Sequence, residues 1–468
     1  MDRIKPLLER PELFFLVVAT MFGLLFATLI PPFQTPDEYI HFYRAYETSE
    51  LKVPAYHNEL KGAGSYMPKS IKETEDATRG GPEQIRFNPR EKYDQRLTKY
   101  ALIDVPLNQD EKIFYNTVPV GPQYLPLSYA PQAAVIAMAK LFDSPIIVMI
   151  YLLRLANLAI WVAICFFAIK IFPWKKWALV LVLLIPTAVS QSISMGLDVT
   201  VYASAILFIA ILFRALAERS RTITLSELAV LILTAVIMVF GKVTFIALLP
   251  MILLVRSKQL PMRGWGSKLL VALTPIFLYV IWSFITKDFN PAGEIPTSAD
   301  QIRSILTNPF IFPIELMSTF FFVWGDSIAQ SLIGNFGWLD TPLSAPFVIF
   351  GFIMLLAAFL STDEKQRRPL LDRRQTLVLY ALAAIYFVGV CLAMYIYTSP
   401  LEQRYITGVQ GRYMIPILVM LAPVVYSSSI SIRSGAFTRF VQYSSVSLLL
   451  ISAIAIIFRY YIVYYPMA

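Results

Sequence analysis

Long apolar runs recur along the chain and constrain its fold more than any other feature. They are Leu13–Ile30, Ile146–Phe172, Ala178–Ser194, Val199–Ala217, Leu228–Phe240, Val243–Val255, Leu269–Thr286, Pro346–Leu360, Thr376–Tyr397, Met414–Tyr426 and Val441–Phe458. A run of about 20 apolar residues crosses the hydrocarbon core of a bilayer as an α-helix. Of the 468 residues 15% are charged, whereas a soluble chain carries about 25%. The sequence therefore predicts an all-α integral membrane protein with about 11 transmembrane helices, several of them short.

Basic residues cluster in a subset of the loops. The clusters are Lys170/Lys175/Lys176, Arg214/Arg219/Arg221, Arg256/Lys258/Arg263/Lys268, Lys365/Arg367/Arg368/Arg373/Arg374 and Arg433/Arg439. Short basic loops stay in the cytoplasm, and all of these clusters do so only if the short run Gln132–Phe142 does not cross. We therefore expect Gln132–Phe142 to be a re-entrant or interfacial helix in a protein of the cytoplasmic (inner) membrane, with the N-terminus inside and the C-terminus outside. These loops explain the net charge of +9, so no nucleic-acid partner is expected.

The apolar runs divide the chain into segments. We expect a first transmembrane helix in residues 1–31, an extracytoplasmic loop with juxtamembrane and re-entrant helices in 32–145, a transmembrane bundle in 146–286, a second extracytoplasmic segment in 287–345 and C-terminal transmembrane helices in 346–468. The loop has several glycines and prolines and little periodicity, which predicts irregular structure with short helices. Cys165 and Cys391 both lie inside apolar runs, so no disulfide framework is expected.

A short ionisable stretch follows the first apolar run. Pro31 and Pro32 end that run, because proline lacks an N–H and cannot continue a helix. Pro36 then predicts the start of a new helix. Ionisable groups at a membrane edge are costly and usually functional. The candidate catalytic residues are Asp37, Glu38 and His41, and on the new helix Arg44, a candidate substrate contact, shares a face with Asp37 and His41.

Other unusual polar residues fall on the same predicted side of the membrane. The candidate substrate-binding residues are Tyr124, Asp198, Lys242, Trp338, Asp340, Arg404, Gln410, Arg412 and Tyr413. Arg404 and Arg412 flank a pair of glycines and resemble a phosphate clamp, because a guanidinium fork matches phosphate oxygens. Simpler roles remain open: a helix N-cap for Asp198, snorkelling for Lys242 and Arg412, and a belt aromatic and a turn acid for Trp338 and Asp340.

Several classes of site are excluded or left open by the sequence. With two histidines in the chain, a multi-histidine zinc site is impossible. No P-loop, G-x-S-x-G or H-E-x-x-H motif is present. Asp37, Glu38 and Asp198 have the oxygen ligands that a divalent metal ion takes, so the sequence leaves the need for a metal cofactor open.

Three stretches of the chain resemble a known family. They are Pro31–Glu38 with His41, Ser194…Asp198, and Gly408–Pro416, whose first and third members are fairly specific. In order and spacing they are similar to a family of polytopic bacterial membrane proteins of unknown function that is grouped with the GT-C-type glycosyltransferases. The resemblance covers nearly the whole chain and implies a GT-C-like fold.

The resemblance also implies an activity. It implies an enzyme that moves a hexose or pentose from a polyprenyl-phosphate carrier to a cell-envelope glycan, lipid or polymer at the outer membrane face. Enzymes of this type keep a catalytic acid in the first outer loop, where Asp37 and Glu38 lie. Asp37 would deprotonate the acceptor hydroxyl, with Glu38 as the alternate base or as a metal or sugar contact. His41 would orient the carboxylate or the phosphate, and the cationic residues would hold the phosphate in the membrane-embedded carrier lipid.

Two other functions compete with this one. A lipid-linked glycan transporter or flippase would explain the spans and the cations, but predicts charges along the membrane interior and an inverted repeat. A non-catalytic envelope-assembly subunit would use the large loop as a binding module. That reading leaves the ionisable residues of 37–44 unexplained.

Overall fold

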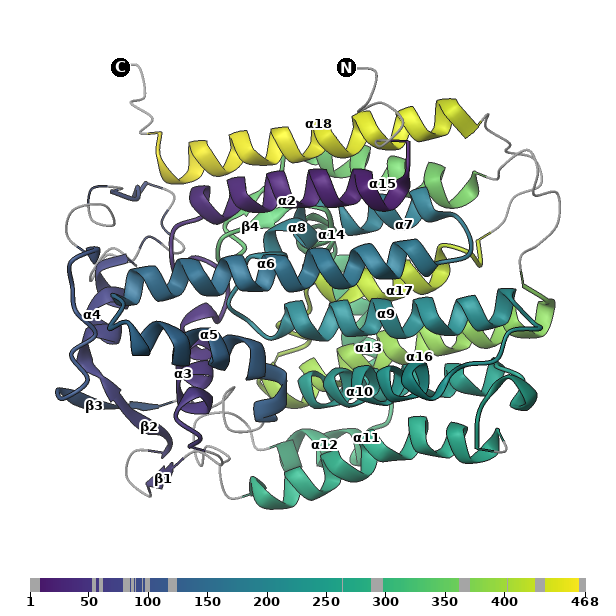
Figure 1. The fold of residues 1–468 in the computed structure, drawn as a ribbon, viewed down its shortest axis with the longest axis horizontal. Coiled ribbons are helices and arrows are strands. Elements are labelled where there is room, and N and C mark those ends of the chain that lie inside the picture. The colour runs from purple at the N-terminus through teal and green to yellow at the C-terminus, as the bar shows by residue number, and fades with distance from the viewer. Residues whose placement is uncertain are drawn as a thin grey trace.

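The computed structural model describes residues 9–52, 56–58, 62–78, 85, 88, 90–94, 96, 102–116, 124–262, 264–287, 298–361, 371–401, 403–425 and 434–462. Within these ranges the chain is mostly helical, and its long helices lie side by side in one bundle (Figure 1). Arg263, Lys365, Arg367, Arg368 and Arg433, which entered the prediction of orientation, lie outside the described residues.

Among the described residues, six helices are long and apolar enough to cross a membrane. They are α2 (Pro11–Leu29), α6 (Ile146–Ile171), α9 (Asp198–Ala217), α11 (Trp265–Ile285), α16 (Arg373–Thr398) and α18 (Ser434–Tyr460). A further apolar pair, α12 (Ser298–Thr307) with α13 (Ile311–Ser318) and the π-helical turn η7 (Thr319–Val323), is bent by 107°. This confirms a helical, multi-pass architecture, but it does not confirm a count of about 11 spans.

Four of the predicted spans form shorter apolar helices. They are α10 (Leu225–Gly241), the 3₁₀ helix η4 (Val243–Leu254), α15 (Ala345–Leu360), and η8 (Gly411–Met414) continued by α17 (Ile415–Leu421). The break between α10 and η4 falls at Lys242, as the sequence predicted. The single span predicted over Ala178–Ser194 is wrong. It is divided into α7 (Lys176–Leu183) and α8 (Pro186–Ser192), because Pro186 has no N–H to continue the first helix.

The polar segment after α2 contains, beside short helices such as the sequence predicted, a small sheet that the sequence did not predict. The sheet pairs β1 (Tyr56–Asn58), β2 (Gly62–Pro68) and β3 (Lys112–Asn116) in antiparallel order, with Ser65 opposite Tyr115. Ser65 and Met67 are buried and Tyr66 is exposed, which is the two-residue alternation of a strand. Helix α4 (Lys69–Thr78) follows β2 directly.

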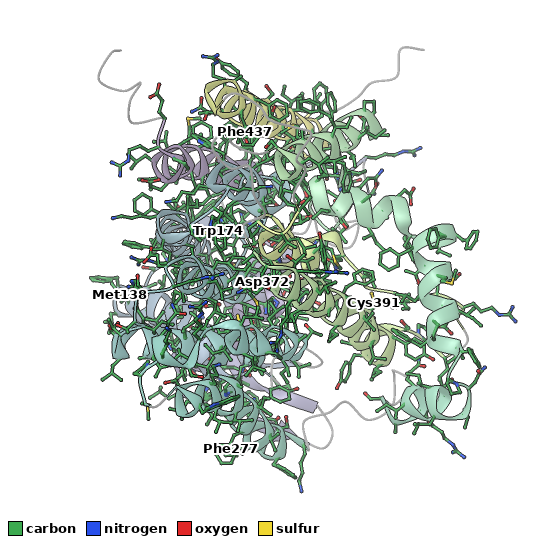
Figure 2. All side chains as sticks on the ribbon, turned by 90° about the vertical axis from the view of Figure 1, so that its right-hand side faces the viewer. Met138, Trp174, Phe277, Asp372, Cys391 and Phe437 are labelled. Carbon is green, nitrogen blue, oxygen red and sulfur yellow. The ribbon has the colours of Figure 1, made fainter. Side chains whose placement is uncertain are left out.

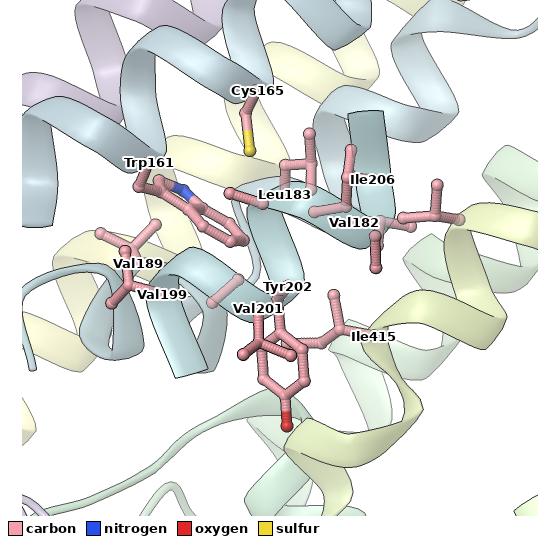
Figure 3. Close-up of a cluster of buried hydrophobic side chains, with 14 of the residues drawn as sticks. Trp161, Cys165, Val182, Leu183, Val189, Val199, Val201, Tyr202, Ile206 and Ile415 are labelled. Atoms are coloured by element: carbon pink, nitrogen blue, oxygen red, sulfur yellow. The ribbon is translucent and has the colours of Figure 1, made fainter. Parts of the chain in front are cut away.

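The core lies around α9 (Figure 1). In the apolar stretch of α9 that is long enough to cross a membrane, 89% of the residues are buried. Trp161 and Cys165 of α6 pack with Leu183 of α7 and Ile206 of α9 in one apolar cluster (Figure 3). The outer helices keep large apolar side chains on the surface, as Phe277 of α11 does at 64% exposure (Figure 2). An apolar surface on a bundle of spanning helices is what a hydrocarbon solvent requires.

Short elements gather where α2 ends and α6 begins. Helix α3 (Glu38–Ser49) contacts α5 (Ala130–Leu141) and η3 (Pro126–Tyr129). Beyond α14 (Gly325–Ile333), a two-stranded hairpin joins β4 (Asn335–Phe336) to β5 (Thr341–Pro342). We call the end of the bundle that holds α3 and the sheet the loop end.

The remaining turn of 3₁₀ helix, η5 (Ser257–Gln259), follows η4.

Candidate functional site

A carboxylate and two cations meet at the first residue of α9. Asp198 Oδ1 lies 2.8 Å from Lys242 Nζ, and Asp198 Oδ2 lies 3.4 Å from Arg412 Nε. No side-chain cap bond holds the start of α9, so Asp198 pairs with these cations instead of acting as an N-cap. The side chains of Asp198 and Arg412 are 11% and 9% exposed. The three residues therefore form a nearly buried ionic group.

Lys242 and Arg412 are held by further contacts. Lys242 Nζ donates to the hydroxyl of Tyr202 at 3.0 Å and lies 4.2 Å from the ring centroid of Tyr413. Arg412 Nη1 donates to Gln191 Oε1 at 3.0 Å. Both cations thus point inward, and neither has the free, mobile head of a snorkelling side chain.

The turn that carries Arg412 approaches α14 closely. Gly411 N donates to Ser331 Oγ at 2.7 Å, and a Cβ at Gly411 would collide with the backbone of Ile328 and Leu332. Only glycine allows this approach. Of the two glycines between Arg404 and Arg412, Gly411 thus serves to pack the η8 turn against α14.

His41 on α3 reaches the same place. Its Nδ1 lies 2.6 Å from the hydroxyl of Tyr129, and its ring faces Gly196 just before α9. Desolvation by the surrounding protein lowers the pKa of His41, and the negative charges of Asp37 and Asp198 only partly oppose this. The imidazole is therefore neutral near pH 7. We call His41, Asp198, Lys242, Arg412 and Tyr413 the central cluster.

Asp37 lies at the edge of the central cluster. It precedes α3 in a left-handed conformation (φ 60°) and makes no cap hydrogen bond. Its charge raises the pKa of His41 and of Tyr124, whose pKa lies above its ordinary value mainly because of burial. The ring of Tyr124 lies 6.1 Å from that of His41. Asp37 is thus a half-buried carboxylate whose oxygens are not committed to the helix that follows.

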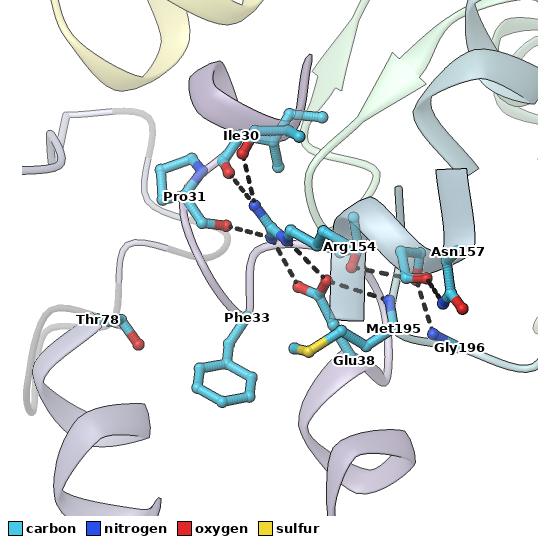
Figure 4. Close-up of polar contacts among 12 residues, drawn as sticks. Ile30, Pro31, Phe33, Glu38, Thr78, Arg154, Asn157, Met195 and Gly196 are labelled. Carbon is cyan, nitrogen blue, oxygen red and sulfur yellow. Dashed lines mark hydrogen bonds and ion pairs between the residues drawn. The ribbon is translucent and has the colours of Figure 1, made fainter. Parts of the chain in front are cut away.

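Glu38, the neighbouring acid, points elsewhere. It is fully buried and forms an ion pair with Arg154 of α6, at 3.0 Å between Oε2 and Nη2 (Figure 4). Arg154 also donates to the carbonyls of Ile30 and Pro31, at 2.5 and 2.9 Å, and so fastens α6 to the end of α2. Glu38 further accepts from the Met195 N–H. Both of its oxygens therefore serve packing of the bundle.

Arg44 shares its face of α3 with His41, but it is fully buried in another ion pair. Its Nη1 lies 2.9 Å from Glu47 Oε2, and its Nη2 donates to the carbonyl of Tyr124 at 3.3 Å. Arg44 thus anchors the segment that brings Tyr124 to the site. It is not placed as a direct substrate contact.

Three predicted binding residues make their contacts outside the central cluster, and a fourth, Gln410, borders it. Trp338 and Asp340 belong to the β4–β5 hairpin, where Trp338 Nε1 donates to the carbonyl of Phe33 and Asp340 pairs with Arg459. Gln410 is half-buried directly before η8, and its carbonyl accepts from the N–H of Tyr413 at 3.1 Å. Arg404 is exposed on the loop after α16. The sequence suggested Arg404 as the second cation beside Arg412, but in the structure that cation is Lys242, which pairs with the same carboxylate.

The described residues contain no group of three or more His, Cys, Asp or Glu side chains placed to share a metal ion. Of the three acids considered as oxygen ligands, Glu38 is turned to Arg154 and Asp198 to Lys242 and Arg412. Of these three acids, Asp37 is the one whose carboxylate forms no ion pair among the described residues.

Sequence reasoning missed Arg154, Tyr129 and Gln191. Arg154 had a visible signal, because a charge inside the apolar run Ile146–Phe172 requires a partner. Tyr129 and Gln191 had none, because a tyrosine or glutamine beside an apolar run is common. Their contacts with His41 and Arg412 depend on packing between segments distant in the sequence.

Comparison with known families decides where the chain belongs. A family described as a predicted membrane protein (DUF2142) matches residues 20–421, which include the central cluster and the loop end. The chain belongs to this family. No curated protein and no solved structure matches it. The family match and the apolar helices together make it a multi-pass membrane protein.

Proposed function

We propose that the protein is a GT-C-type glycosyltransferase, which moves a sugar from a polyprenyl-phosphate carrier to a cell-envelope acceptor at the outer face of the cytoplasmic membrane. One observation carries the proposal. A free carboxylate, a neutral imidazole and two inward-pointing cations, all named from the sequence, meet at one end of a membrane bundle. Ionisable groups gathered out of solvent in this way are typical of functional sites.

The charge balance of the central cluster suits a phosphodiester. Within the central cluster Asp198 compensates one of the two cations, Lys242 and Arg412, and leaves one positive charge, which the Asp37 carboxylate at the cluster's edge also faces until it takes up a proton. A sugar joined to a lipid by one phosphate carries one negative charge. The guanidinium of Arg412 and the ammonium of Lys242 would bind its oxygens and stabilise the phosphate monoester dianion that leaves.

Asp37 is the proposed general base. It would take the proton of the acceptor hydroxyl while the acceptor oxygen bonds to the anomeric carbon of the sugar. The bond between that carbon and the phosphate oxygen breaks in the same step, and its electron pair leaves with the carrier phosphate. The transfer inverts the anomeric centre. Glu38 is not proposed as the base, because Arg154 and the Met195 N–H hold both its oxygens.

His41 is proposed to orient the reacting groups. Its neutral ring bonds to Tyr129 through Nδ1 and leaves Nε2 on the side of Gly196 and the cluster. A neutral imidazole there supplies a hydrogen bond without competing with Lys242 and Arg412 for the phosphate. The transfer assay described below, run with and without a chelator, tests whether a divalent metal ion also takes part.

The test is a transfer assay with purified protein. The protein in proteoliposomes is incubated with radiolabelled polyprenyl-phosphate sugar and cell-envelope acceptor, beside Asp37→Asn as the inactive control. Label should move to the acceptor with the wild type. Movement of the labelled lipid between leaflets with no transfer would support a transporter. Acceptor binding without either activity would support an assembly subunit.

A further inference from the structure

Asp37 lies at the end of a strained turn. Phe33 and Asp37 both have left-handed backbones, with φ of 59° and 60°. Such values are uncommon for residues other than glycine, and for a bulky side chain such as Phe33 they persist only where surrounding contacts hold them. Phe33 is fully buried, with its ring 6.0 Å from that of Phe42. The direction of the Asp37 carboxylate therefore depends on what holds this turn.

Trp338 contacts the turn from the β4–β5 hairpin. Its indole Nε1 donates to the Phe33 carbonyl at 3.1 Å, and its ring centroid lies 6.2 Å from that of Tyr39. One side chain thus contacts residues on both sides of Asp37. On the far side of the turn, Glu38 is fixed to Arg154 (Figure 4). Asp37 lies between these two attachments.

The hairpin that carries Trp338 is itself fixed. Gly337 has φ of 62°, and a Cβ there would collide with Tyr460 and Asp340. Asp340 lies 2.6 Å from Arg459 at the end of α18, and both side chains are nearly buried. Arg459 also donates to the carbonyl of Ile85 at 2.6 Å. The hairpin is therefore bound to both the C-terminal helix and the first polar segment.

We propose that Trp338 is a positioning residue, whose indole N–H holds the Phe33–Asp37 turn and thereby aims the Asp37 carboxylate at the central cluster. The inference rests on the proposed function for its catalytic consequence, but its structural part is independent of it. Trp338 contacts Phe33 and Tyr39, on either side of Asp37, so its effect on the reaction passes through Asp37. Its loss should lower the rate of the chemical step and leave donor binding intact.

The experiment replaces Trp338 with its benzothienyl isostere, which keeps the ring shape and lacks the N–H, and with Trp338→Phe. Trp265, which is 62% exposed at the start of α11, receives the same changes as a control. We expect kcat to fall about tenfold to a hundredfold at Trp338, as for a small misplacement of a reacting group. KM for the donor and Tm should stay near their wild-type values, and the Trp265 variants should behave as wild type.

Hydrogen exchange supplies a readout that needs no activity. Peptides covering residues 33–41 should exchange faster in both Trp338 variants than in wild type or the Trp265 variants, because opening of the turn becomes easier. Unchanged exchange, or unchanged kcat in an active enzyme, would overturn the positioning role. A wild type that transfers no sugar but shows the exchange difference would instead refute the glycosyltransferase proposal alone.

Discussion

Lys242 Nζ lies 2.8 Å from Asp198 Oδ1, and the two side chains are 20% and 11% exposed. The pair joins the break after α10 to the first residue of α9, and Arg412 approaches the other oxygen of Asp198. A buried carboxylate that faces two cations keeps them in place before any ligand arrives. A phosphate bound there, as in the proposed function, would find the cations already oriented, which reduces the cost of ordering them.

The first prediction concerns the phosphate clamp. Arg412→Lys keeps the positive charge but loses the planar fork and its bond to Gln191. Hydrogen bonds to charged groups contribute about 1.5–3 kcal/mol, so donor affinity should fall about tenfold to a hundredfold, and further in Arg412→Ala. The measurement is the Kd of the donor lipid. Arg404→Lys, at an exposed position, is the matched control, and equal losses at both positions would restore Arg404 to the clamp.

The second prediction concerns the base. Asp37→Asn keeps the shape of the side chain but cannot take a proton. Turnover should fall about a hundredfold to ten-thousandfold, while donor binding and Tm are preserved. The rate of label transfer and the Kd of the donor decide the outcome. Asp326→Asn, on the exposed start of α14, serves as control. Near-normal turnover of a folded Asp37→Asn protein would refute the role of Asp37 as the general base.

The sequence predicted those features of the fold that depend on residues close together in the chain. The sequence predicted that Pro31 and Pro32 end the first apolar helix, that the ionisable stretch after them is helical, as α3 is, and that the chain breaks near Lys242. Each follows from helix rules that act within a few residues. The convergence of Asp37, His41, Asp198, Lys242 and Arg412 also followed from placing their segments on one side of the membrane.

What the sequence did not reveal depends on distant partners. The strand β2 contains Gly64 and Pro68 and pairs with β3, so its neighbours do not identify it as a strand. The two adjacent acids are alike in sequence, and only the packing of α6 against α2 gives Glu38 its partner Arg154. Arg404 has the composition of a clamp residue, but the loop after α16 leaves it exposed.

The third prediction separates Glu38 from Asp37 by stability. Glu38→Gln leaves Arg154 buried without its counter-charge, which typically costs about 3–5 kcal/mol. Tm in detergent should therefore fall strongly, unlike in Asp37→Asn. The double variant Glu38→Leu/Arg154→Met should recover part of the loss, because no unpaired charge stays buried, although the carbonyls of Ile30 and Pro31 lose their donor. Arg214→Gln, in a more exposed pair with Glu218, should change Tm little. A stable Glu38→Gln protein would contradict the assigned packing role.

The fourth prediction concerns pH. The pKa of His41 is lowered in the folded protein, mainly by desolvation. Below the ordinary value of about 6.5, the unfolded chain therefore binds a proton that the folded chain does not. Stability is then fully present above pH 6.5 and decreases as the pH falls below it. His41→Asn should flatten this decrease. The measurement is Tm between pH 7.5 and 5, and identical curves for wild type and His41→Asn would refute the depressed pKa.

The last prediction concerns orientation, which decides whether the central cluster can meet an outer acceptor. Leu401, in the loop after α16, is 45% exposed. At the opposite end, Gly435 opens α18, and a Cβ there meets nothing within 4 Å. In a background lacking the buried Cys165 and Cys391, Leu401→Cys should react with an impermeant thiol reagent in intact cells. Gly435→Cys should react only after the membrane is opened. The reverse pattern would place Asp37 and the two cations in the cytoplasm, where the proposed transfer to a cell-envelope acceptor has no substrate.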